Sequence, residues 1–527
     1  MSLDAPLTGE EEASTSPFLA EAVAALPRLL GGFDRNRASP TFGVGDRLYW
    51  AWGVLDFPNA TFQGAVHGMA RLWAHGMWPY ATDPAHFIDR LDSVIRAIGS
   101  CASADGSLCE AFPNEGSWCV TALVAYDALA AIELMADHVE ADQLDRWTAS
   151  IEPLAKYIRR NDETHAFISN HLATGAAALD RWSVARNCEA SRRASSSLID
   201  RILSRQHSEG WYVEYQGFDA GYQSLATYYL ADIASRSLVP GLGESLERSV
   251  EFVSHCIHPD GSFGGYYGSR NTRFYVPGGF HLLAPTSPTA AAIAARMAGS
   301  VGAKTVVTLS SLDAPNTPPM FNAYCLAAVT PIAADAGSTL PAERPEPTRI
   351  AFPGAGLMFD RGPNHYTVVS TKKGGVVQHY VGGLEAVVDC GVIYEQAGRV
   401  GSTQFFDEDA DSDLDRSRLT VRTHVRAIVT DVPLPWQFAA LRIGAITFLR
   451  IRRLREFLKR RLVGMLITGP KPWSVRNVRV IELGEHLTIH DVAEPAGVVT
   501  RRQSNGPFTA IHMASQGYWQ LQDEVRR

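Results

Sequence analysis

Two short stretches of the sequence combine side chains that can move a proton and hold an anion. In the first, an amide and an imidazole, Asn170 and His171, stand together at the head of a helical pattern rich in small residues. The second begins about forty residues later with an acidic-glycine turn at Glu209 and reaches Tyr222 at the start of the next helical pattern. Loops that feed helices carry exposed side chains on a fixed scaffold. We therefore expect the two stretches to face one another across a cleft.

These residue types suit chemistry on an acidic sugar. A phenol can serve as both general base and general acid, because its pKa of about 10 falls when a cation stands nearby. An amide and a histidine can stabilise the enolate-like charge that develops beside a carboxylate when the neighbouring carbon loses a proton. Each residue also has an ordinary structural explanation. Tyr222 could pack in a helix core, Asn170 could cap a helix, and His171 could be a buried histidine with a structural partner.

A glycine-rich turn further along the chain adds cations and aromatic rings. Arginine presents a planar fork that matches a carboxylate, so the turn suits an anionic sugar, although surface arginines on a structural turn would look the same. The candidate binding residues in this turn are Arg270, Asn271, Arg273, Tyr275 and His281. Glu214, Tyr215 and the sugar-stacking candidate Trp118 come from the earlier turns.

The elements that must position these residues repeat along the chain. Three acidic-glycine turns, at Asp105, Glu209 and Asp260, are separated by 104 and 51 residues, which indicates a period near 52. A helical pattern follows each turn, and a unit of this length accommodates a helical hairpin. Five or six hairpins that close on themselves would form an (α/α) toroid. An open array or an irregular helical domain is the alternative.

The pattern changes after a proline-rich segment. We expect a flexible leader over residues 1–16, the toroid over 17–334 as the catalytic domain, and a linker over 335–348. Residues 349–527 contain short β-branched segments separated by Gly, Asn and Asp, which is typical of an antiparallel β domain. The predicted fold class is therefore α+β and multidomain, with the toroid followed by a β-sandwich.

A helical insertion interrupts the β domain at residues 436–466. Between Arg442 and Arg461 it carries eight basic residues and one acid, Glu456. A basic amphipathic helix is typical of a membrane surface or an acidic partner. The alternative is a buried helix whose arginines extend over the sheet with their charged ends in water.

The Asn170-His171 pair, the acidic-glycine-aromatic turn and the Gly221-Tyr222 pair together resemble the heparinase II/III-like polysaccharide lyases and the related alginate lyases. In those families an (α/α) toroid precedes a β-sandwich. The resemblance implies a lyase that removes the C5 proton of a uronate and expels the oxygen at C4. It assigns neutralisation of the carboxylate to Asn170 and His171, and the base and acid roles to Tyr222.

The resemblance also covers a histidine in the β domain. Gly374 to His379, followed by Asp389-Cys-Gly, resembles the segment from which such lyases direct a histidine to the site, so His379 is a substrate-binding candidate. The acidic residue usual two positions after this histidine is Val381 here. The cysteines form no CxxC pair, and the acidic run from Asp407 lacks the glycine and glutamate of a calcium loop. We expect no metal and no cofactor.

Composition narrows the class of protein. The net charge of −8 argues against nucleic-acid binding, and seven cysteines without framework spacing suggest reduced thiols. The acidic N-terminus is unlike a signal peptide, and no apolar run reaches the roughly 18 residues that span a bilayer. We therefore expect a cytoplasmic protein, with peripheral attachment at the inner membrane face through 436–466, that acts on an acidic oligo- or polysaccharide.

Two other functions fit the same sequence. A glycoside hydrolase on the same toroid would use a carboxylate pair drawn from Glu110, Glu115, Glu214 and Asp219. A non-catalytic glycan-binding or assembly protein at the membrane face, active in surface-polysaccharide synthesis, would need neither a base nor an acid.

Overall fold

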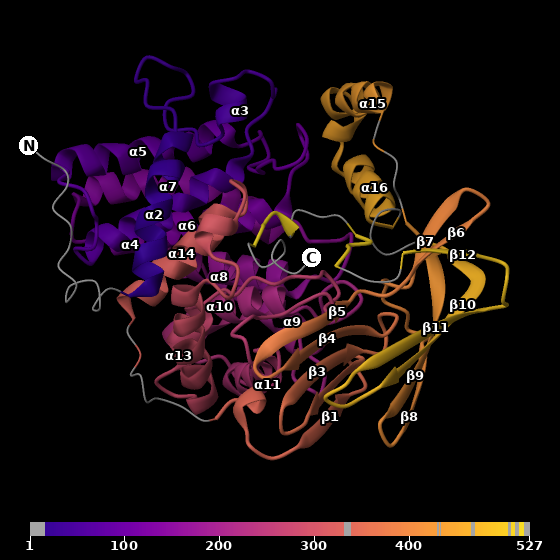
Figure 1. Ribbon diagram of the computed structural model, residues 1–527. Helices are drawn as coiled ribbons and strands as arrows, with labels where there is room; N and C mark the ends of the chain where they lie inside the picture. The colour runs from indigo at the N-terminus through magenta and orange to yellow at the C-terminus, as the bar shows by residue number, and fades with distance from the viewer. Residues whose placement is uncertain are drawn as a thin grey trace, which may run out of the picture.

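The structure is a computed structural model that describes residues 16–330, 332, 339–428, 432, 434–464, 470–503, 507–511 and 516–520. The expected leader, apart from Ser16, and the first part of the expected linker, residues 335–338, lie outside these residues. The helices fill the first part of the described chain and the strands follow (Figure 1). Helix α14 ends at Val329 and strand β1 begins at Thr348.

The helices form a closed double ring. The inner ring consists of α4 (Val66–Ala74), α6 (Trp118–Leu134), α8 (Ser169–Ala185), α10 (Ala220–Arg236), α12 (Gly278–Leu283) and α14 (Thr317–Val329). Each packs against the next, and α14 returns to pack against α4. The outer ring consists of α2 (Pro17–Gly32), α5 (Pro84–Cys101), α7 (Ala141–Arg160), α9 (Glu189–Leu203), α11 (Leu242–Ser254) and α13 (Pro288–Ala303). A short helix, α3 (Arg47–Trp50), lies outside both rings. The predicted (α/α) toroid is confirmed.

Sequence pattern separates the two rings. Helix α6 is built largely from alanine and other apolar residues and is buried on nearly every face, as expected of a helix enclosed by others. In the outer helix α7, Trp147, Ile151, Leu154 and Ile158 line one buried face at helical spacing, and the opposite face is polar. The outer helix α7 is thus amphipathic, whereas the inner helix α6 is apolar on nearly every face.

The repeated turns have a common construction at two of their three positions. The Asp105 and Asp260 carboxylates each accept hydrogen bonds from the backbone and hydroxyl groups of the serine two residues later. The glycine after each acid has a positive φ, 86° at Gly106 and 84° at Gly261, where a Cβ would be strained. Glu209 differs because its carboxylate accepts from the backbone N–H groups of Gly354 and Ala355 in the β domain.

The β domain consists of two antiparallel sheets. The first has the order β1 (Thr348–Phe352), β2 (Leu357–Arg361), β3 (His365–Ser370), β4 (Val376–Val381) and β5 (Leu384–Asp389). The second has the order β11 (Thr488–Glu494), β10 (Pro472–Glu482), β9 (Arg418–Ala427), β7 (Arg399–Ser402), β6 (Ile393–Gln396) and β12 (Thr500–Gln503), with β8 (Asp411–Asp415) paired to β9.

The first sheet lies between the toroid and the second sheet. On one face, the Tyr366 hydroxyl donates to the His255 carbonyl at 2.7 Å, and the Tyr380 ring stacks on His258. On the other face, Val369 and Val377 pack with Val421 of the second sheet. The two sheets therefore form the predicted sandwich, and the toroid covers its outer side.

The insertion contains α15 (Pro435–Ile446) and α16 (Arg452–Val463), between β9 and β10. It stands away from the sheets and contacts the toroid (Figure 1). In the described part of the chain, no helix has the length and apolar character needed to cross a membrane.

Candidate active site

The loops that lead into α8 and α10 are joined by backbone hydrogen bonds. The Ser169 N–H donates to the Val213 carbonyl at 3.2 Å, and the Tyr215 N–H donates to the Phe167 carbonyl at 3.0 Å. The Ser269 N–H donates to the Phe218 carbonyl at 2.7 Å, so the glycine-rich turn is joined to these two loops and the three form one group. Inner helices follow outer helices throughout the ring, so the loops before them gather at one end of the toroid. The chemistry-bearing stretches therefore lie side by side, and the expected cleft separates them from the β domain and not from each other.

Asn170 and Glu214 form a buried pair in this group. The Asn170 Nδ2 donates to the Glu214 Oε1 at 2.7 Å. Helix α8 begins at Ser169 after Ile168, and the Asn170 side chain makes no capping bond, so the capping explanation for Asn170 is wrong. Burial raises the pKa of Glu214 to about 8, although the nearby Arg270 and Asn170 act in the opposite direction. Glu214 is therefore mainly a neutral acid at pH 7.

Arg270 links the Asn170–Glu214 pair to two phenols. Its buried guanidinium lies 4.3 Å from the ring centroid of Tyr215 and 5.3 Å from that of Tyr222. Burial alone would lower the pKa of Arg270, but Tyr222, Tyr215 and Glu214 together raise it above its usual value. The interaction is mutual, so the guanidinium stabilises negative charge on the Tyr222 oxygen. Its Nε is buried without a hydrogen-bond partner among the described residues.

Asp219 fixes Tyr222 and Arg270 relative to each other. Its Oδ1 accepts from the Tyr222 N–H at 3.2 Å, as the N-cap of α10. Its Oδ2 accepts from the Arg270 N–H at 3.0 Å, and the Thr272 hydroxyl donates to the same carboxylate. Asp219 is therefore committed to backbone and hydroxyl donors, which leaves it poorly suited to the hydrolytic role considered for it above.

His171 is held by a second carboxylate. The Glu163 Oε2 lies 2.8 Å from the His171 Nδ1, and its Oε1 lies 2.7 Å from the His165 Nδ1. Burial opposes ionisation of Glu163, but the two histidines overcome it and hold the pKa of Glu163 well below its usual value. An ionised carboxylate only accepts, so the His171 Nδ1 must carry a proton. Burial lowers the pKa of His171, and in the neutral ring the Nε2 is then an acceptor. Only the protonated ring can donate to a substrate carboxylate.

Lys373, in the turn between β3 and β4, reaches the site from the β domain. Its buried ammonium donates to the Tyr266 carbonyl at 2.9 Å and to Gly268 and the Asn271 side chain. Burial lowers the pKa of Lys373 to about 7. These bonds clamp the glycine-rich turn that carries Arg270. Asn271 is at φ 59°, and its buried Nδ2 has no hydrogen-bond partner among the described residues.

Four of the candidate binding residues lie outside this group. Trp118 packs between helices, with its indole N–H donating to the carbonyls of Ile158 and Asn161. Tyr275 is fully buried between the rings of Phe263 and Phe280. His281 is bonded to the Thr330 carbonyl at 2.8 Å, and burial lowers its pKa to about 4. These three residues belong to the core of the toroid.

His379 is the fourth of these residues. It bonds to the Thr367 hydroxyl at 2.8 Å and to the Glu485 carbonyl at 3.2 Å, so its ring lies between the two sheets. Successive residues of a strand face opposite sides, and its neighbour Tyr380 faces the toroid. Arg273 stays with the glycine-rich turn, where its guanidinium lies 5.7 Å from the Tyr266 ring centroid.

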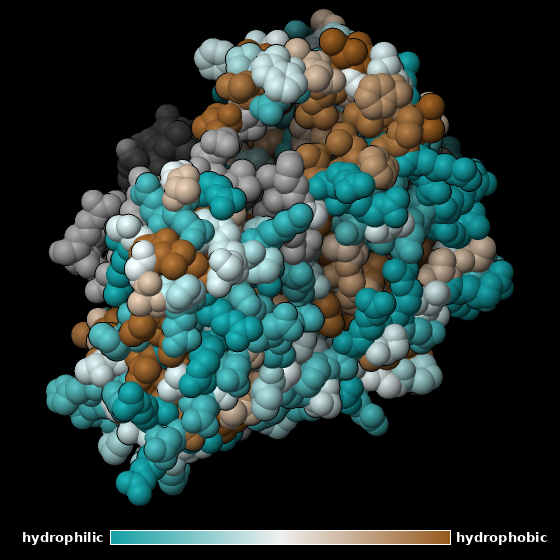
Figure 2. Space-filling view, turned by 90° about the vertical axis from the view of Figure 1, so that its right-hand side faces the viewer, coloured by the Kyte–Doolittle hydropathy of each residue, from teal (hydrophilic) through white to brown (hydrophobic). Residues whose placement is uncertain are grey.

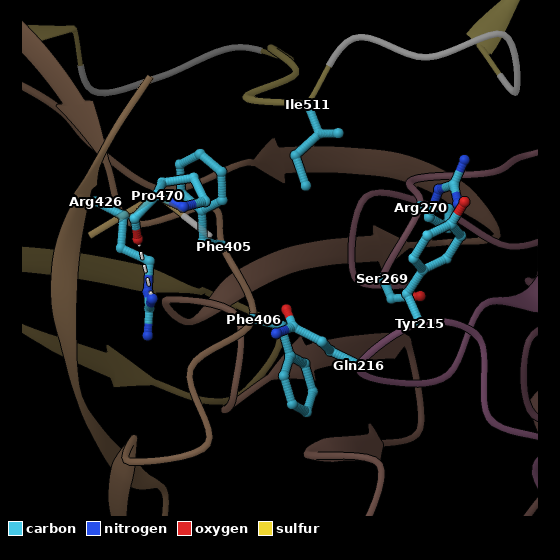
Figure 3. Close-up of a pocket in the computed structure, with 9 residues that line it drawn as sticks. All are labelled: Tyr215, Gln216, Ser269, Arg270, Phe405, Phe406, Arg426, Pro470 and Ile511. Atoms are coloured by element: carbon cyan, nitrogen blue, oxygen red, sulfur yellow. Dashed lines mark hydrogen bonds between the residues drawn. The ribbon is translucent and has the colours of Figure 1, made fainter. Parts of the chain in front are cut away.

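A cleft opens between the toroid loops and the β domain (Figure 3). Tyr215 and Arg270 lie on its toroid side, and Phe405 and Arg426 lie on its β side. Tyr222 borders a neighbouring small apolar hollow with Phe274 and Met320. The cleft thus combines aromatic surfaces with the guanidinium groups of Arg270 and Arg426, which suits an anionic sugar. Among the described residues, no cluster of His, Cys, Asp or Glu is arranged to hold a metal ion.

Comparison with known proteins gives structural matches only. Neither a protein-family model nor a curated protein matches the sequence. The chondroitin AC lyase of Streptomyces coelicolor A3, in complex with chondroitin sulphate, is 14% identical with a TM-score of 0.50, over 79% of this chain and 64% of that one. A Paenibacillus xanthan lyase is 11% identical (TM-score 0.49; 80% and 46% covered). Heparinase III is also 11% identical (TM-score 0.49; 81% and 70% covered).

The chain thus spans less than two thirds of chondroitin AC lyase and less than half of xanthan lyase. The match to chondroitin AC lyase extends over both the helical and the β parts, since it covers 79% of this chain. The resemblance inferred from the Asn170-His171 and Tyr222 stretches is confirmed at the level of the fold. This chain has a polysaccharide-lyase-like fold, an (α/α) toroid followed by an antiparallel β-sandwich.

Proposed function

We propose that this protein is a polysaccharide lyase that cleaves a uronate-containing glycan by β-elimination. The observation that carries the proposal is the buried chain of contacts from Asn170 through Glu214 and Arg270 to Tyr222. It combines a phenol beside a cation with an amide beside a neutral acid. Chondroitin AC lyase, which has the same fold, acts on an acidic glycan, and this supports the substrate class.

In the proposed reaction, the Tyr222 phenolate accepts the C5 proton of the uronate. The electrons of the C–H bond form the C4–C5 double bond as the bond from C4 to the glycosidic oxygen breaks. The Tyr222 phenol then returns a proton to the leaving oxygen, so atoms and charge balance. Asn170 and neutral Glu214 donate hydrogen bonds to the uronate carboxylate, as does His171 when protonated, and stabilise the enolate-like charge.

The direct test is incubation of the purified protein with a panel of uronate-containing polysaccharides. Elimination creates an unsaturated uronate that absorbs ultraviolet light. We expect absorbance to rise in step with new chain ends for at least one substrate. New reducing ends without absorbance would contradict the lyase proposal.

The pKa of Glu214 predicts an alkaline limit to activity. Below a pH of about 8, Glu214 is neutral and tolerates the substrate carboxylate. Above that pH it loses its proton, and its charge repels the uronate, so kcat/KM should fall as pH rises. Glu214→Gln keeps the neutral shape and should remove this alkaline decline in the pH profile. An unchanged decline in the variant would show that another group sets the limit.

Hydrolysis is the second candidate, favoured by two glutamates with raised pKa values. Desolvation and the nearby charge of Glu115 raise the pKa of Glu110 to about 7, and burial raises that of Glu214 to about 8. Such acids can protonate a leaving glycosidic oxygen. Glu115 is less suited, because its Oε2 accepts from the backbone N–H groups of Glu110 and Ala111. The absorbance test distinguishes the two reactions.

We also propose that the insertion attaches the protein peripherally to the inner membrane face. Arg455 and Lys459 face the toroid, where they approach Asp105 at 3.7 Å and Glu115 at 3.8 Å. Large apolar side chains consequently point outward, including Phe448 (54% exposed) and Phe457 (52% exposed). The arrangement is opposite to a buried helix whose arginines extend into water. Apolar side chains among cations are the surface that binds an anionic bilayer.

Vesicle binding tests this attachment. Replacing Phe448 and Phe457 together by aspartate should weaken binding to vesicles with anionic lipid by at least tenfold, since burying each ring contributes about 1.5–3 kcal/mol. Co-sedimentation with vesicles measures the affinity. Leu238→Asp, at a fully exposed leucine of the toroid, is the matched control and should bind as the unchanged protein does. Equal binding by the double variant would dispose of the attachment.

A further inference from the structure

A large cavity lies between the toroid and α15, beside the candidate active site. Its volume is about 720 Å³, within the range of about 300–1,000 Å³ typical of small-molecule sites. Its walls come from the end of α2, from the segment around residues 45–62, from the start of α14 and from α15. Most of the side chains that line it are apolar, among them Leu29, Phe33, Leu55, Phe57, Phe62 and Phe438.

Most polar groups in the cavity wall already form hydrogen bonds within the protein. The Arg28 guanidinium donates to the carbonyls of Leu309 and Leu312 and to the Thr317 hydroxyl. The buried Asp46 carboxylate accepts from the N–H groups of Leu48 and Asn59. A polar ligand would find few free partners deep in this wall, whereas a hydrocarbon chain needs none. The lining therefore selects an apolar occupant.

The mouth of the cavity opens onto the outer surface of the insertion. Phe438 of α15 and Leu48 both line the cavity and are more than half exposed. Figure 2 shows apolar side chains gathered at the top of the molecule, where α15 and α16 lie in Figure 1. Arg442, also in the lining, lies 5.2 Å from the Phe57 ring centroid and 3.0 Å from the Asp56 carboxylate. Arg47 is a second, exposed cation in the lining, so the mouth offers positive charge beside apolar surface.

One wall of the cavity, at Glu110 and Ala111, lies near the candidate active site. The negative charge of Glu163 contributes to the raised pKa of Glu110. Glu163 is the carboxylate that holds His171. The cavity therefore lies on the same side of the toroid as the group that includes His171 and Asn170.

We infer that this cavity binds the hydrocarbon chain of a lipid-linked anionic glycan, the glycan of which lies in the candidate active site. The inference rests on the proposed function for its substrate class. The apolar lining accommodates the chain, the exposed face of α15 and α16 receives it from a membrane, and Arg47 and Arg442 face the phosphate that joins chain to glycan. The substrate is thus a membrane-held glycan intermediate with a long alkyl or isoprenoid tail.

Substitution of two helical glycines, one inside and one outside the cavity lining, tests the inference with farnesyl phosphate as the probe. Gly31 lines the cavity in the last turn of α2, and a Cβ there would meet no atom within 4 Å. Gly31→Trp should occupy the cavity and weaken farnesyl phosphate binding, measured by titration calorimetry, by at least tenfold. Gly99 has the same freedom in the last turn of α5, outside the cavity lining, so Gly99→Trp should bind as the unchanged protein does.

A second variant keeps the test decisive if Gly31→Trp does not fold. Phe438→Glu places a charge at the exposed cavity wall and should weaken binding to a similar extent. Inorganic phosphate should not compete with farnesyl phosphate at equal concentration. No saturable binding by the unchanged protein, or equal affinity in the folded cavity variants, would overturn the inference. Binding is measured without turnover, so lyase activity without probe binding refutes only this inference, and probe binding without lyase activity refutes only the proposed function.

Discussion

Replacing Tyr222 by phenylalanine should lower kcat by about a thousandfold, since a positioned general acid–base group contributes roughly 10²–10⁴. The change removes the oxygen that accepts the C5 proton and returns a proton to the leaving group. The ring remains, including its edge-to-face contact with Phe274 at 5.5 Å between centroids, so the melting temperature and KM should change little. Initial rates by ultraviolet absorbance, with a thermal melt of each protein, measure both.

Tyr215→Phe is the natural control for Tyr222→Phe. Both phenols face the same guanidinium, but burial raises the pKa of Tyr215 despite the nearby Arg270. We expect the loss for Tyr215→Phe to be at least tenfold smaller than for Tyr222→Phe. Undiminished turnover in Tyr222→Phe would make the proposed mechanism wrong, and a reversed order of the two variants would move the base to Tyr215.

Replacing Arg270 by glutamine should lower kcat by roughly 10²–10³, the usual cost of removing one group that stabilises a developing charge. It should also move the acidic limb of the pH–rate profile to higher pH. Without the guanidinium, negative charge on the Tyr222 oxygen is less stable, so a higher pH is needed to form the base. Arg270→Lys, which keeps the charge but not the planar stack, should recover part of the rate and of the shift.

The shift of the acidic limb of the pH–rate profile distinguishes a catalytic role of Arg270 from a role in holding the loop in place. Arg270 holds the loop through its backbone N–H to Asp219, which a side-chain substitution leaves in place. Loss of rate with an unmoved limb in Arg270→Gln would mean that Arg270 positions the substrate and does not affect the base.

The helical repeat of the toroid could be predicted from the sequence because the same local turn pattern recurs along the chain. The acidic-glycine turns at Asp105 and Asp260 have the same hydrogen bonds in the structure, so the distance between them in the sequence corresponds to a repeated structural unit. Helix α10 begins directly after its N-cap Asp219, close to its predicted start. Such bonds join residues a few positions apart, and single-sequence reasoning can find them.

The parts of the site that escaped prediction depend on contacts between distant segments. Lys373 clamps a loop about a hundred residues earlier in the chain, and no local pattern marks it. Glu163 lies in the loop before α8, eight residues ahead of His171, so the path of the loop brings the pair together, although an acid followed closely by histidines is a usable signal.

Prediction from residue type alone also proposed binding residues whose side chains are buried in the core. Trp118 and Tyr275 have the rings expected of a sugar-binding surface, yet they pack inside the toroid. His379 lies on the face of its strand away from the toroid, and a shift of one residue would have reversed that face. Burial in a closed ring is a property of the assembled helices, so the local sequence does not reveal which aromatic side chains remain exposed.

The most direct test of the proposed β-elimination is cleavage in water enriched in ¹⁸O. Elimination adds no water across the bond, so each pair of products should have the combined mass of the substrate and contain no ¹⁸O from the cleavage step. Mass spectrometry of products collected within the first turnovers, before oxygen exchange at the reducing ends, measures this. We predict an unlabelled, unsaturated non-reducing end on one product. One ¹⁸O atom incorporated per bond cleaved would contradict the proposed function and identify the protein as a hydrolase.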